Sequence, residues 1–550
     1  MSDKQRDILG ALAAIGLGLC GFSVLIGWTT LIPTNIGWLD FADRAMHTLG
    51  WMFFRQTPWG VPPGVSPRLG LELANSIGLV DGLPLLALPA KLLSPWLPYP
   101  VQYWGLWLLC CFVLQALFAW LIARELGAGR ILALIAAGFA LITPAYMFRI
   151  EMHLALSGHW TILAALWLYT RRTAPPRWAW PLLVALTAGI HAYLLAMVMA
   201  LWLAAFAERL LDRRMSWRGA LLELAGGAGA ALLILWAAGF FVSGTTGTYG
   251  YGAYKLNLLW PFLTYKGWSQ IVPDLPHTKY DYEGLSFLGI GVLALIALSI
   301  ATGAVVQLRA IASRRWMPLA LALLLLMMFA LSKDIAFADH ELFAIPLPDP
   351  IDSLASTFRS TGRFVWPLLY VVTIGAVVLI STRLRAAFAI PLALAAVVAQ
   401  AADSGPALLT FAERLPPVSD HWESPLQSPF WQRAAAAGYT RIRVIPVVSN
   451  PGTDWKALGY FAATHDMAID SVYLGRVDAG DLAALRAHEQ QVLDTGAFEP
   501  GTLYILDPNS ALVAQPHVGP GDLLARIDDR IVLAKGGAHL ADGLELAPVF

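Results

Sequence analysis

The sequence predicts an α-helical polytopic membrane protein that ends in a soluble α/β domain. Of its 550 residues, 57% are hydrophobic and only 13% are charged, which is typical of membrane proteins. Apolar runs long enough to cross a bilayer recur up to residue 402, and charged residues become more frequent after it. We therefore expect a transmembrane domain over residues 1–402 and a soluble domain over residues 403–550.

About eleven segments of the first part qualify as membrane spans by length and composition. They are residues 8–32, 101–123, 131–149, 156–170, 178–190, 193–208, 219–242, 286–308, 317–332, 364–381 and 386–402. The first follows the charged leader SDKQRD, is longer than the apolar core of a signal peptide and lacks a clear cleavage site, so we interpret it as a span.

The charges of the connecting loops decide how residues 178–208 are divided, since each half is short and the two could form one helix. If the stretch is split at His191 and Tyr193, every Lys/Arg-rich connection falls on one side of the membrane. These connections are the N-terminus, RELGAGR, TRRTAPPR, DRRMSWR, RAIASRR and TRLR. That side is the cytoplasm by the positive-inside rule, so the periplasm receives the C-terminal domain and the loops 33–100, 243–285 and 333–363.

The segment IGLVDGLPLLALPAKLLSPWLP, residues 77–98, is apolar but is not counted as a span. Four prolines interrupt it, and it carries Asp81 and Lys91. Counting it would also move RRTAPPR to the wrong side. We expect a re-entrant or interfacial segment.

The C-terminal domain alternates between expected strands and helices. RIRVIPVV, SVYLG, TLYIL and RIVLAK predict strands, and DWKALGYFAATHD and AGDLAALRAHEQQVLDTG predict helices. The domain has the size of a single compact unit. It carries no glycine-rich phosphate-binding motif, so a nucleotide-binding role has little support.

Charge and cysteine usage exclude further classes of protein. The formal net charge is +0, and no basic stretch is interleaved with aromatic residues, so nucleic acid is not an expected partner. Cys20, Cys110 and Cys111 all lie in apolar runs, so neither a disulfide framework nor a zinc site is encoded.

The first outer loop carries ionisable residues in an apolar setting. In WLDFADRAMHTLGW, the spacing of Asp40, Asp43, Arg44 and His47 would place them on one face of an interfacial helix. No soluble ATP or nucleotide sugar is available outside the inner membrane, so an enzyme there often takes an activated group from a lipid carrier. A carboxylate in this loop could accept the proton of an acceptor hydroxyl, with Asp43 ahead of Asp40. The alternative is that the stripe solvates the helix or pairs with Arg44.

Arg359 and Arg363 lie in STFRSTGRFVWP, four residues apart, at the outer mouth of a span. The fork of guanidinium donors suits a phosphate, which at this depth would belong to a lipid. The alternatives are snorkelling and a pair with Asp349 or Asp352.

The loop TTGTYGYGAYKLNLLWPF, residues 245–262, adds candidate ligands. Tyrosine rings such as Tyr254 can stack on sugars, and Lys255, close to Asn257, could add a second phosphate contact. Glu283 follows in KYDYEGLSFLG, just before a span. An ordinary flexible loop is the alternative.

Three histidines lie near outer ends of spans: His153 and His159 in RIEMHLALSGHW, and His191 in the short helix pair. On one face they could bind a divalent cation or orient a phosphate. The spacing i, i+6 of the first two is not that of a ligand pair on one helix. Hydrogen-bonded structural histidines are therefore expected, and no cofactor is firmly implied.

Several of these features together resemble the GT-C architecture of multipass glycosyltransferases, which mostly use polyprenyl-phosphate-linked sugars. They are the acidic first outer loop, the short helix pair, the late arginines and the C-terminal outer domain. More narrowly, DRAMHTLGWMFFRQTPWG, VDGLPLLALPAK, YGYGAYKLNLLWPF with YEGLSFLGIG, and FRSTGRFVWP are similar to an uncharacterised family of bacterial inner-membrane proteins related to that group. The resemblance covers most of residues 1–400. It implies Asp43 as the catalytic aspartate and Arg359 or Arg363 as the lipid-phosphate clamp.

The sequence thus predicts an inverting glycosyltransferase that moves a sugar from a polyprenyl-phosphate carrier to a glycan, lipid or protein acceptor at the periplasmic face of a bacterial inner membrane. Asp81 and His153 would support the site, because intramembrane ionisable groups are costly. The alternatives are a transporter or flippase for a lipid-linked glycan and a non-catalytic assembly protein for envelope polysaccharide. No internal repeat is found and the candidate charges lie at span entrances, which favours the enzyme.

Overall fold

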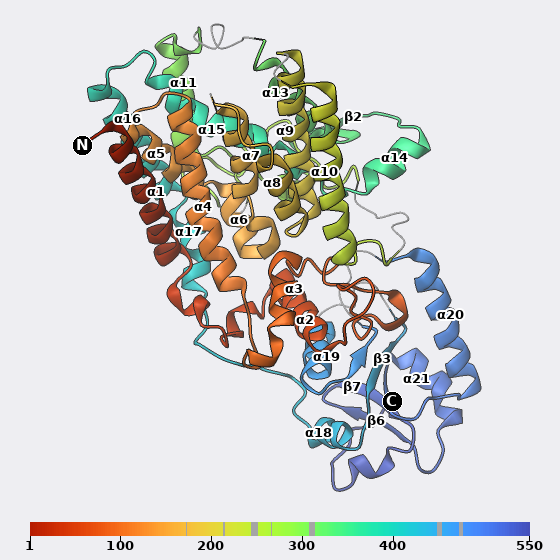
Figure 1. The fold of residues 1–550 in the computed structure, drawn as a ribbon. Helices are drawn as coiled ribbons and strands as arrows, with labels where there is room; N and C mark the ends of the chain where they lie inside the picture. The colour runs from red at the N-terminus through yellow and green to blue at the C-terminus, as the bar shows by residue number, and fades with distance from the viewer. Residues whose placement is uncertain are drawn as a thin grey trace. The chain divides into compact units, whose positions relative to one another are not determined.

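The structure is a computed structural model that describes residues 1–171, 173–212, 215–243, 251–265, 267–306, 314–447, 454–471 and 477–549. It is mostly helical (Figure 1) and divides into two compact units. Unit 1 comprises Met1–Pro33, Tyr103–Ile234 and Thr248–Pro417, and unit 2 comprises Thr34–Gln102, Leu235–Gly247 and Val418–Phe550. The first outer loop thus belongs to the same unit as the C-terminal domain. The domain boundary expected at residue 402 stays a prediction.

Unit 1 is built from helices. They are α1 (Asp3–Leu25), α4 (Trp104–Glu125), α5 (Arg130–Leu141), α6 (Pro144–Met152), α7 (Trp160–Thr170), α8 (Ala179–Ala188), α9 (Ala192–Leu211), α10 (Trp217–Ala237, which runs into unit 2), α11 (Ile290–Ala301), α13 (Met317–Leu331), α14 (Asp349–Ser356), α15 (Trp366–Ile380), α16 (Ala386–Asp403) and α17 (Gly405–Glu413). A hairpin of β1 (Asp334–Phe337) and β2 (His340–Ala344) lies between α13 and α14.

Six helical runs in the described part of the chain are long and apolar enough to cross a bilayer. They are α1, α4, α9, α10, the run Thr361–Ile380 that ends in α15, and α16. The pair α5 and α6 makes a seventh if it forms one span, and α8, α11 and α13 are apolar but shorter. These helices indicate a polytopic membrane protein.

Close packing of α1 on α4 depends on a small residue (Figure 1). A Cβ added to Gly18 would lie only 2.7 Å from the carbonyl oxygen of Phe112, so only glycine allows this approach. At the N-terminal end of α1, the Asp7 carboxylate lies 3.0 Å from Arg124 and 2.8 Å from Arg130. Both apolar packing and ion pairs therefore fix the first helix.

Two helix breaks have clear local causes. Pro144 starts α6, and because proline has no N–H it cannot continue α5, which bends the pair by 42°. The break after α8 leaves His191 as the N-cap of α9, where its Nδ1 accepts a hydrogen bond from the Tyr193 N–H at 3.1 Å. The predicted split of residues 178–208 is confirmed.

Large apolar side chains point outward from several helices of unit 1. Exposed examples are Leu222 and Leu233 of α10, Leu325 and Met328 of α13, and Phe388 of α16. A water-facing helix would carry polar residues at these positions, so the outward faces match a lipid environment.

Unit 2 contains a five-stranded sheet in the order β4-β3-β5-β7-β6. Its strands are β3 (Arg441–Ile445), β4 (Ala468–Ile469), β5 (Thr502–Leu506), β6 (Leu523–Ile527) and β7 (Arg530–Ala534). β3 is parallel to β4 and β5, and β7 is antiparallel to both of its neighbours. The helices of this part are α18 (Pro429–Ala436), α19 (Asp454–Thr464), α20 (Ala479–Thr495) and α21 (Pro508–Ala514).

The sequence predicted most of this sheet. Strands β3, β5 and β7 and helices α19 and α20 lie where they were expected. The predicted strand SVYLG falls mainly outside the described residues, and β4 is found just before it. β6, α18 and α21 were not predicted.

The first outer loop contributes α2 (Ala42–Gln56) and α3 (Pro84–Leu92) to unit 2. The prediction that Asp40 shares a helical face with Asp43 and His47 is wrong, because Phe41 is extended and the helix begins at Ala42. Most residues of α2 are buried, and its placement at a membrane surface stays a prediction. The segment 77–98 forms only the short α3 and a 3₁₀ turn, Ser94–Trp96, which is too short for a span.

Candidate functional site

Two buried arginines share one carboxylate in unit 1. Arg149 on α6 places Nη1 3.0 Å from Oε2 of Glu283, and Arg363 places Nη2 2.6 Å from the same oxygen. Arg149 also donates from Nη2 to the backbone carbonyl of Glu283 at 2.9 Å. Glu283 lies in a 3₁₀ turn, Asp281–Gly284, and Arg363 lies in another, Thr361–Val365. We call these three residues the arginine cluster.

The arginine cluster keeps its carboxylate ionised. Burial alone would raise the pKa of Glu283, but the charges of Arg363 and Arg149 outweigh it and lower the pKa to about 2. Both arginines are buried, with 2% and 7% of their surface exposed. The cluster therefore holds two permanent positive charges against one negative charge, inside protein where such charges act strongly.

Neighbouring loops hold Arg363 in place. Its guanidinium carbon lies 4.9 Å from the centre of the Tyr193 ring, and the Tyr193 hydroxyl accepts the Ser360 N–H at 2.9 Å. A Cβ on Gly362 would lie 2.7 Å from the Cα of Gly284, so the two turns meet at a distance that only glycine permits.

Of the three predicted histidines, His153 and His191 lie close together near the arginine cluster, and His159 has a different partner. The His153 ring centre lies 5.3 Å from that of His191, and His153 is among the groups that act on the Glu283 carboxylate. His159 is instead held by Tyr370, whose hydroxyl lies 2.7 Å from its Nδ1. Among the residues described, the three histidines do not form a metal-sized group.

The other predicted ligands of unit 1 have structural partners or lie apart. Lys255 is buried and binds Glu341 on β2 at 2.6 Å, and Asn257 donates to Asp281 at 2.8 Å. The ring centre of Tyr254 lies 5.0 Å from that of Tyr280, and the part of that loop before Tyr251 lies outside the described residues. Arg359 lies in a bend, and Arg363 lies in the 3₁₀ turn Thr361–Val365 that follows it.

Arg359 is half-buried in the turn before Arg363 and makes no ion pair with any described residue. The alternative pairing with Asp352 is also not found, because Asp352 binds Lys333 at 2.7 Å. Of the two predicted arginines, only Arg363 belongs to the arginine cluster.

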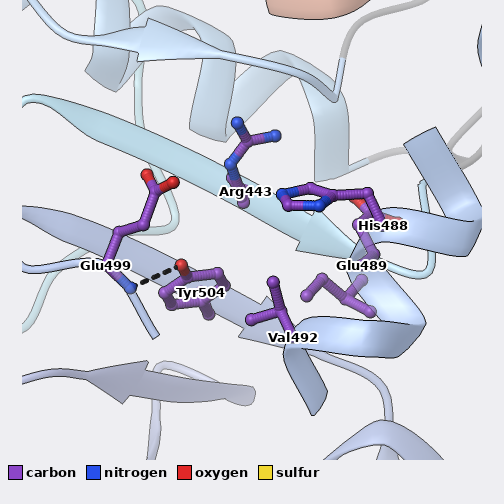
Figure 2. Close-up of a pocket in the computed structure, with 7 residues that line it drawn as sticks. Arg443, His488, Glu489, Val492, Glu499 and Tyr504 are labelled. Carbon is purple, nitrogen blue, oxygen red and sulfur yellow. Dashed lines mark hydrogen bonds between the residues drawn. The ribbon is translucent and has the colours of Figure 1, made fainter. Parts of the chain in front are cut away.

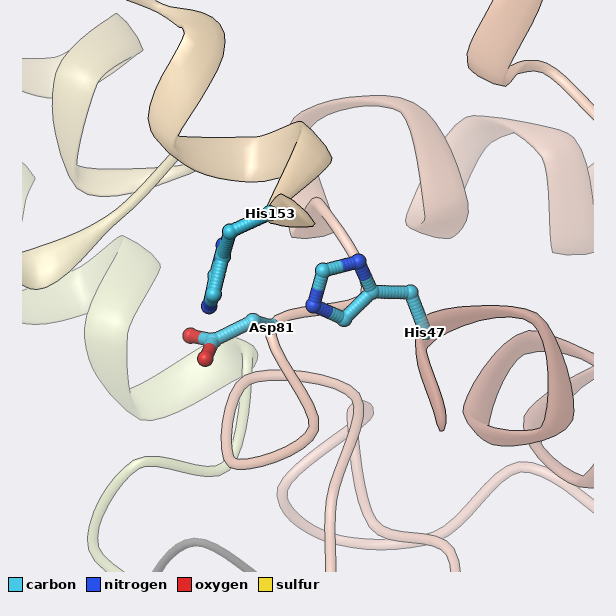
Figure 3. A group of neighbouring side chains, drawn as sticks. All are labelled: His47, Asp81 and His153. Atoms are coloured by element: carbon cyan, nitrogen blue, oxygen red, sulfur yellow. The ribbon is translucent and has the colours of Figure 1, made fainter. Parts of the chain in front are cut away.

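The predicted acidic residues of the first loop lie in unit 2. Asp40 has its Oδ1 2.8 Å from Nζ of Lys456 on α19, and burial raises its pKa more than Lys456 lowers it. Asp43 is half-buried in the first turn of α2. His47 of α2 and Asp81, from the turn before α3, bring their ligand atoms within 4.8 Å of one another (Figure 3).

A second charged centre in unit 2 surrounds Arg443 on β3 (Figure 2). Arg443 binds Glu72 with two hydrogen bonds, of 2.6 and 3.1 Å, and lies 3.5 Å from Asp470. Glu489 of α20 lines a cavity of about 10 Å³ beside it, with room for about one water. We call this set the carboxyl cluster.

Sequence reasoning missed both Arg149 and the carboxyl cluster. Arg149 stands in the same stretch as His153, and Arg443 is a charged residue in the middle of a strand otherwise read as apolar. A charged side chain among buried positions was the available signal for each, because such a group requires a partner.

The fold and the arginine cluster define a polytopic membrane protein with a buried, positively charged site in its helical unit. The chain belongs to the family described as domain of unknown function (DUF6311), whose model matches residues 15–405. The DUF6311 C-terminal domain matches residues 430–535. No curated protein matches the chain.

Proposed function

We propose that this protein is an inverting glycosyltransferase of GT-C architecture with about eleven spans. It takes a sugar from a polyprenyl-phosphate carrier at the periplasmic face of a bacterial inner membrane and gives it to a glycan, lipid or protein of the envelope. The observation that carries the proposal is the arginine cluster. Arg149 lies on α6, Glu283 lies before α11 and Arg363 lies before α15. The loop charges predict that these positions face the side opposite the Lys/Arg-rich connections.

The leaving group explains the need for two arginines. As the bond between the anomeric carbon and the phosphate oxygen breaks, its electron pair passes to the phosphate, which gains negative charge. Arg149 and Arg363 are positioned in advance to stabilise that charge, in a setting where water does not screen it. Glu283 holds both guanidinium groups in orientation before the carrier binds.

The attacking hydroxyl needs a base, and we assign this role to Asp43. The hydroxyl oxygen attacks the anomeric carbon on the face opposite the phosphate, and its proton passes to the carboxylate. One displacement of this kind inverts the configuration and requires no second carboxylate as nucleophile. Asp40, whose carboxylate lies 2.8 Å from Nζ of Lys456, is the alternative base.

The test is transfer of labelled sugar by the purified full chain in lipid, offered a panel of polyprenyl-phosphate donors and envelope extract as acceptor. Asp43→Asn should lower the rate by about 10²–10⁴-fold and still bind donor. Asp339→Asn, at an exposed position on the β1–β2 hairpin, is the matched control and should transfer at the normal rate. If the wild type releases no polyprenyl phosphate from any donor, the glycosyltransferase proposal fails.

A further inference from the structure

A basic cavity lies at the end of α9, whose first turn carries Tyr193 beside Arg363 and whose last turn carries Arg209 in the cavity wall. Its volume is about 200 Å³, far more than the roughly 30 Å³ that one water occupies. It is formed by the end of α7 and the loop after it, the start of α8, the end of α9 and the residue before Trp316. Four arginines line it: Arg171, Arg177, Arg209 and Arg315. We call it the basic pocket.

Two of these arginines build the walls of the basic pocket. Arg315 donates from Nη2 to the carbonyls of Tyr169, Thr170 and Arg171, at 3.1, 3.0 and 2.7 Å, which satisfies the C-terminal end of α7. Arg209 binds Glu223 with two hydrogen bonds, of 2.6 and 3.0 Å. Glu208, which also lines the pocket, lies 3.7 Å from Arg315, so each of these two arginines already has a carboxylate beside it.

The other two arginines are available for a ligand. Within the described part of the chain, Arg171 and Arg177 make no ion pair. Arg171 lies 5.0 Å from the ring centre of Trp167 and donates to Thr173, so its guanidinium is oriented but not neutralised. Two guanidinium groups in a cavity of this size suit a phosphate, which accepts paired hydrogen bonds from each.

An apolar cavity of about 440 Å³ adjoins the basic pocket. Residues that are adjacent in the sequence line the two cavities. Tyr169 and Arg315 line the basic pocket, and Thr170 and Trp316, which follow them, line the apolar cavity. The ring centres of Tyr169 and Trp316 are 5.8 Å apart. From there the apolar cavity extends between α4, α7, α11, α13 and α15 as far as Tyr370, and its lining is almost wholly apolar.

We propose that the two cavities together bind a lipid with a phosphate head group. Arg171 and Arg177 hold the phosphate in the basic pocket, and the hydrocarbon chain fills the apolar cavity beside α15. A free phosphate would leave the apolar cavity without a function, and an uncharged lipid would leave the two arginines without one. The pocket lies at the TRRTAPPR and RAIASRR connections, on the side expected to face the cytoplasm, where anionic lipids attract basic groups.

Three variants of the full chain separate the head-group and chain contacts. Arg171→Gln with Arg177→Gln removes the phosphate contacts. Arg383→Gln with Arg385→Gln removes the same charge from exposed positions on the same expected side and serves as the control. Gly375→Leu fills the apolar cavity, since a Cβ at Gly375 meets no atom within 4 Å.

Each variant is stripped of lipid in detergent and incubated separately with phosphatidylglycerol, phosphatidylcholine, a polyprenyl phosphate and inorganic phosphate. Bound lipid is counted by native mass spectrometry and bound phosphate by equilibrium dialysis with labelled phosphate. We expect an anionic lipid to be retained by the wild type and the control. The double variant Arg171→Gln with Arg177→Gln should bind this lipid more weakly, by on the order of tenfold or more. Gly375→Leu should also lose it.

Retention of phosphatidylglycerol identifies a bilayer phospholipid as the ligand, and retention of the polyprenyl phosphate alone identifies the carrier type. If the wild type binds inorganic phosphate and Gly375→Leu leaves lipid retention unchanged, the lipid proposal is overturned in favour of a soluble phosphate. Equal retention by all variants overturns the site itself. A thermal melt of each variant checks that it is folded, and none of these results depends on sugar transfer.

Discussion

Glu283 in unit 1 and Arg443 in unit 2 are each surrounded by groups of opposite charge, but the ratio of arginines to carboxyls is reversed. Two arginines share Glu283, whereas Glu72, Asp470 and Glu489 surround Arg443. Where arginines outnumber the carboxylate, the pKa of Glu283 falls to about 2. Where carboxyls outnumber the arginine, burial raises the pKa of Asp470 to about 8 and that of Glu489 to about 7.

The reversed ratio gives the two clusters opposite responses to pH. Glu283 has a lowered folded pKa, so its contribution to stability is present above the unfolded value of about 4.5 and is lost as pH falls toward about 2. Asp470 has a raised folded pKa, so its contribution is full below about 4 and is lost as pH rises toward about 8. A cluster with surplus arginine is suited to bind anions, and a cluster with surplus carboxyl is suited to hold protons.

The largest expected effect is that of Glu283→Gln. It removes the carboxylate that Arg149 and Arg363 both contact, and loss of one partner from a buried ion pair costs about 3–5 kcal/mol. Unfolding in a denaturant series, followed by far-ultraviolet circular dichroism, measures this loss. Glu151→Gln is the control on α6, because its partner Arg414 is largely exposed. The control should change stability by at most about 1 kcal/mol, and equal losses in the two variants would contradict the shared-charge account.

Arg363→Gln should lower sugar transfer by about 10²–10³-fold, the usual cost of removing one preorganised charge from a transition state. Arg359→Gln makes the matched comparison, because Arg359 lies four residues earlier and outside the arginine cluster. Its rate should stay within a few-fold of the wild type. Transfer rates at saturating donor measure both, and a larger loss at Arg359 would move the phosphate site to that residue.

At the carboxyl cluster, Asp470→Asn should remove a pH dependence that the wild type shows. The wild type should lose stability as pH rises from about 4 to about 8, by an amount on the order of a few kcal/mol, because the buried carboxyl must give up its proton. Asparagine carries no proton to lose, and its side-chain oxygen can still accept the Val444 N–H that Asp470 accepts at 2.9 Å. Thermal midpoints of both chains across this range measure the difference. Parallel curves would rule out Asp470 as the source.

The sequence predicted elements whose causes are local. The break before α9 and the strand patterns RIRVI, TLYIL and RIVLA act through neighbouring residues, so this break and three strands could be predicted directly. The bend at Pro144 was not predicted, because residues 131–149 were taken as one span. The candidate site depends on distant pairs. Arg363 meets Glu283 across 80 residues of chain, and nothing local shows that Arg363 rather than Arg359 turns toward it.

A helical spacing argument failed in the first outer loop. Asp40, Asp43 and His47 were expected on one helix face, but Asp40 precedes the helix, which begins at Ala42. The spacing rule needs a continuous helix, and the sequence does not fix where a short helix begins to within a turn. Predicted ligands at helix starts are therefore the least secure.

The smallest expected effect is that of Glu489→Gln, which makes in the carboxyl cluster the same exchange that Glu283→Gln makes in the arginine cluster. The two variants therefore compare the clusters directly. At Glu489 the carboxyl Oε2 accepts the Val447 N–H at 3.1 Å, and a glutamine oxygen can do the same. Burial raises the pKa of Glu489 to about 7, so glutamine resembles the protonated form that the fold prefers. Glu489→Gln should leave stability unchanged below about pH 4 and raise it by on the order of 1 kcal/mol above pH 7. Thermal midpoints at the two ends of this range decide the sign. One exchange would then destabilise the arginine cluster and stabilise the carboxyl cluster, and a loss at both would mean that burial, and not the charge ratio, governs the two sites.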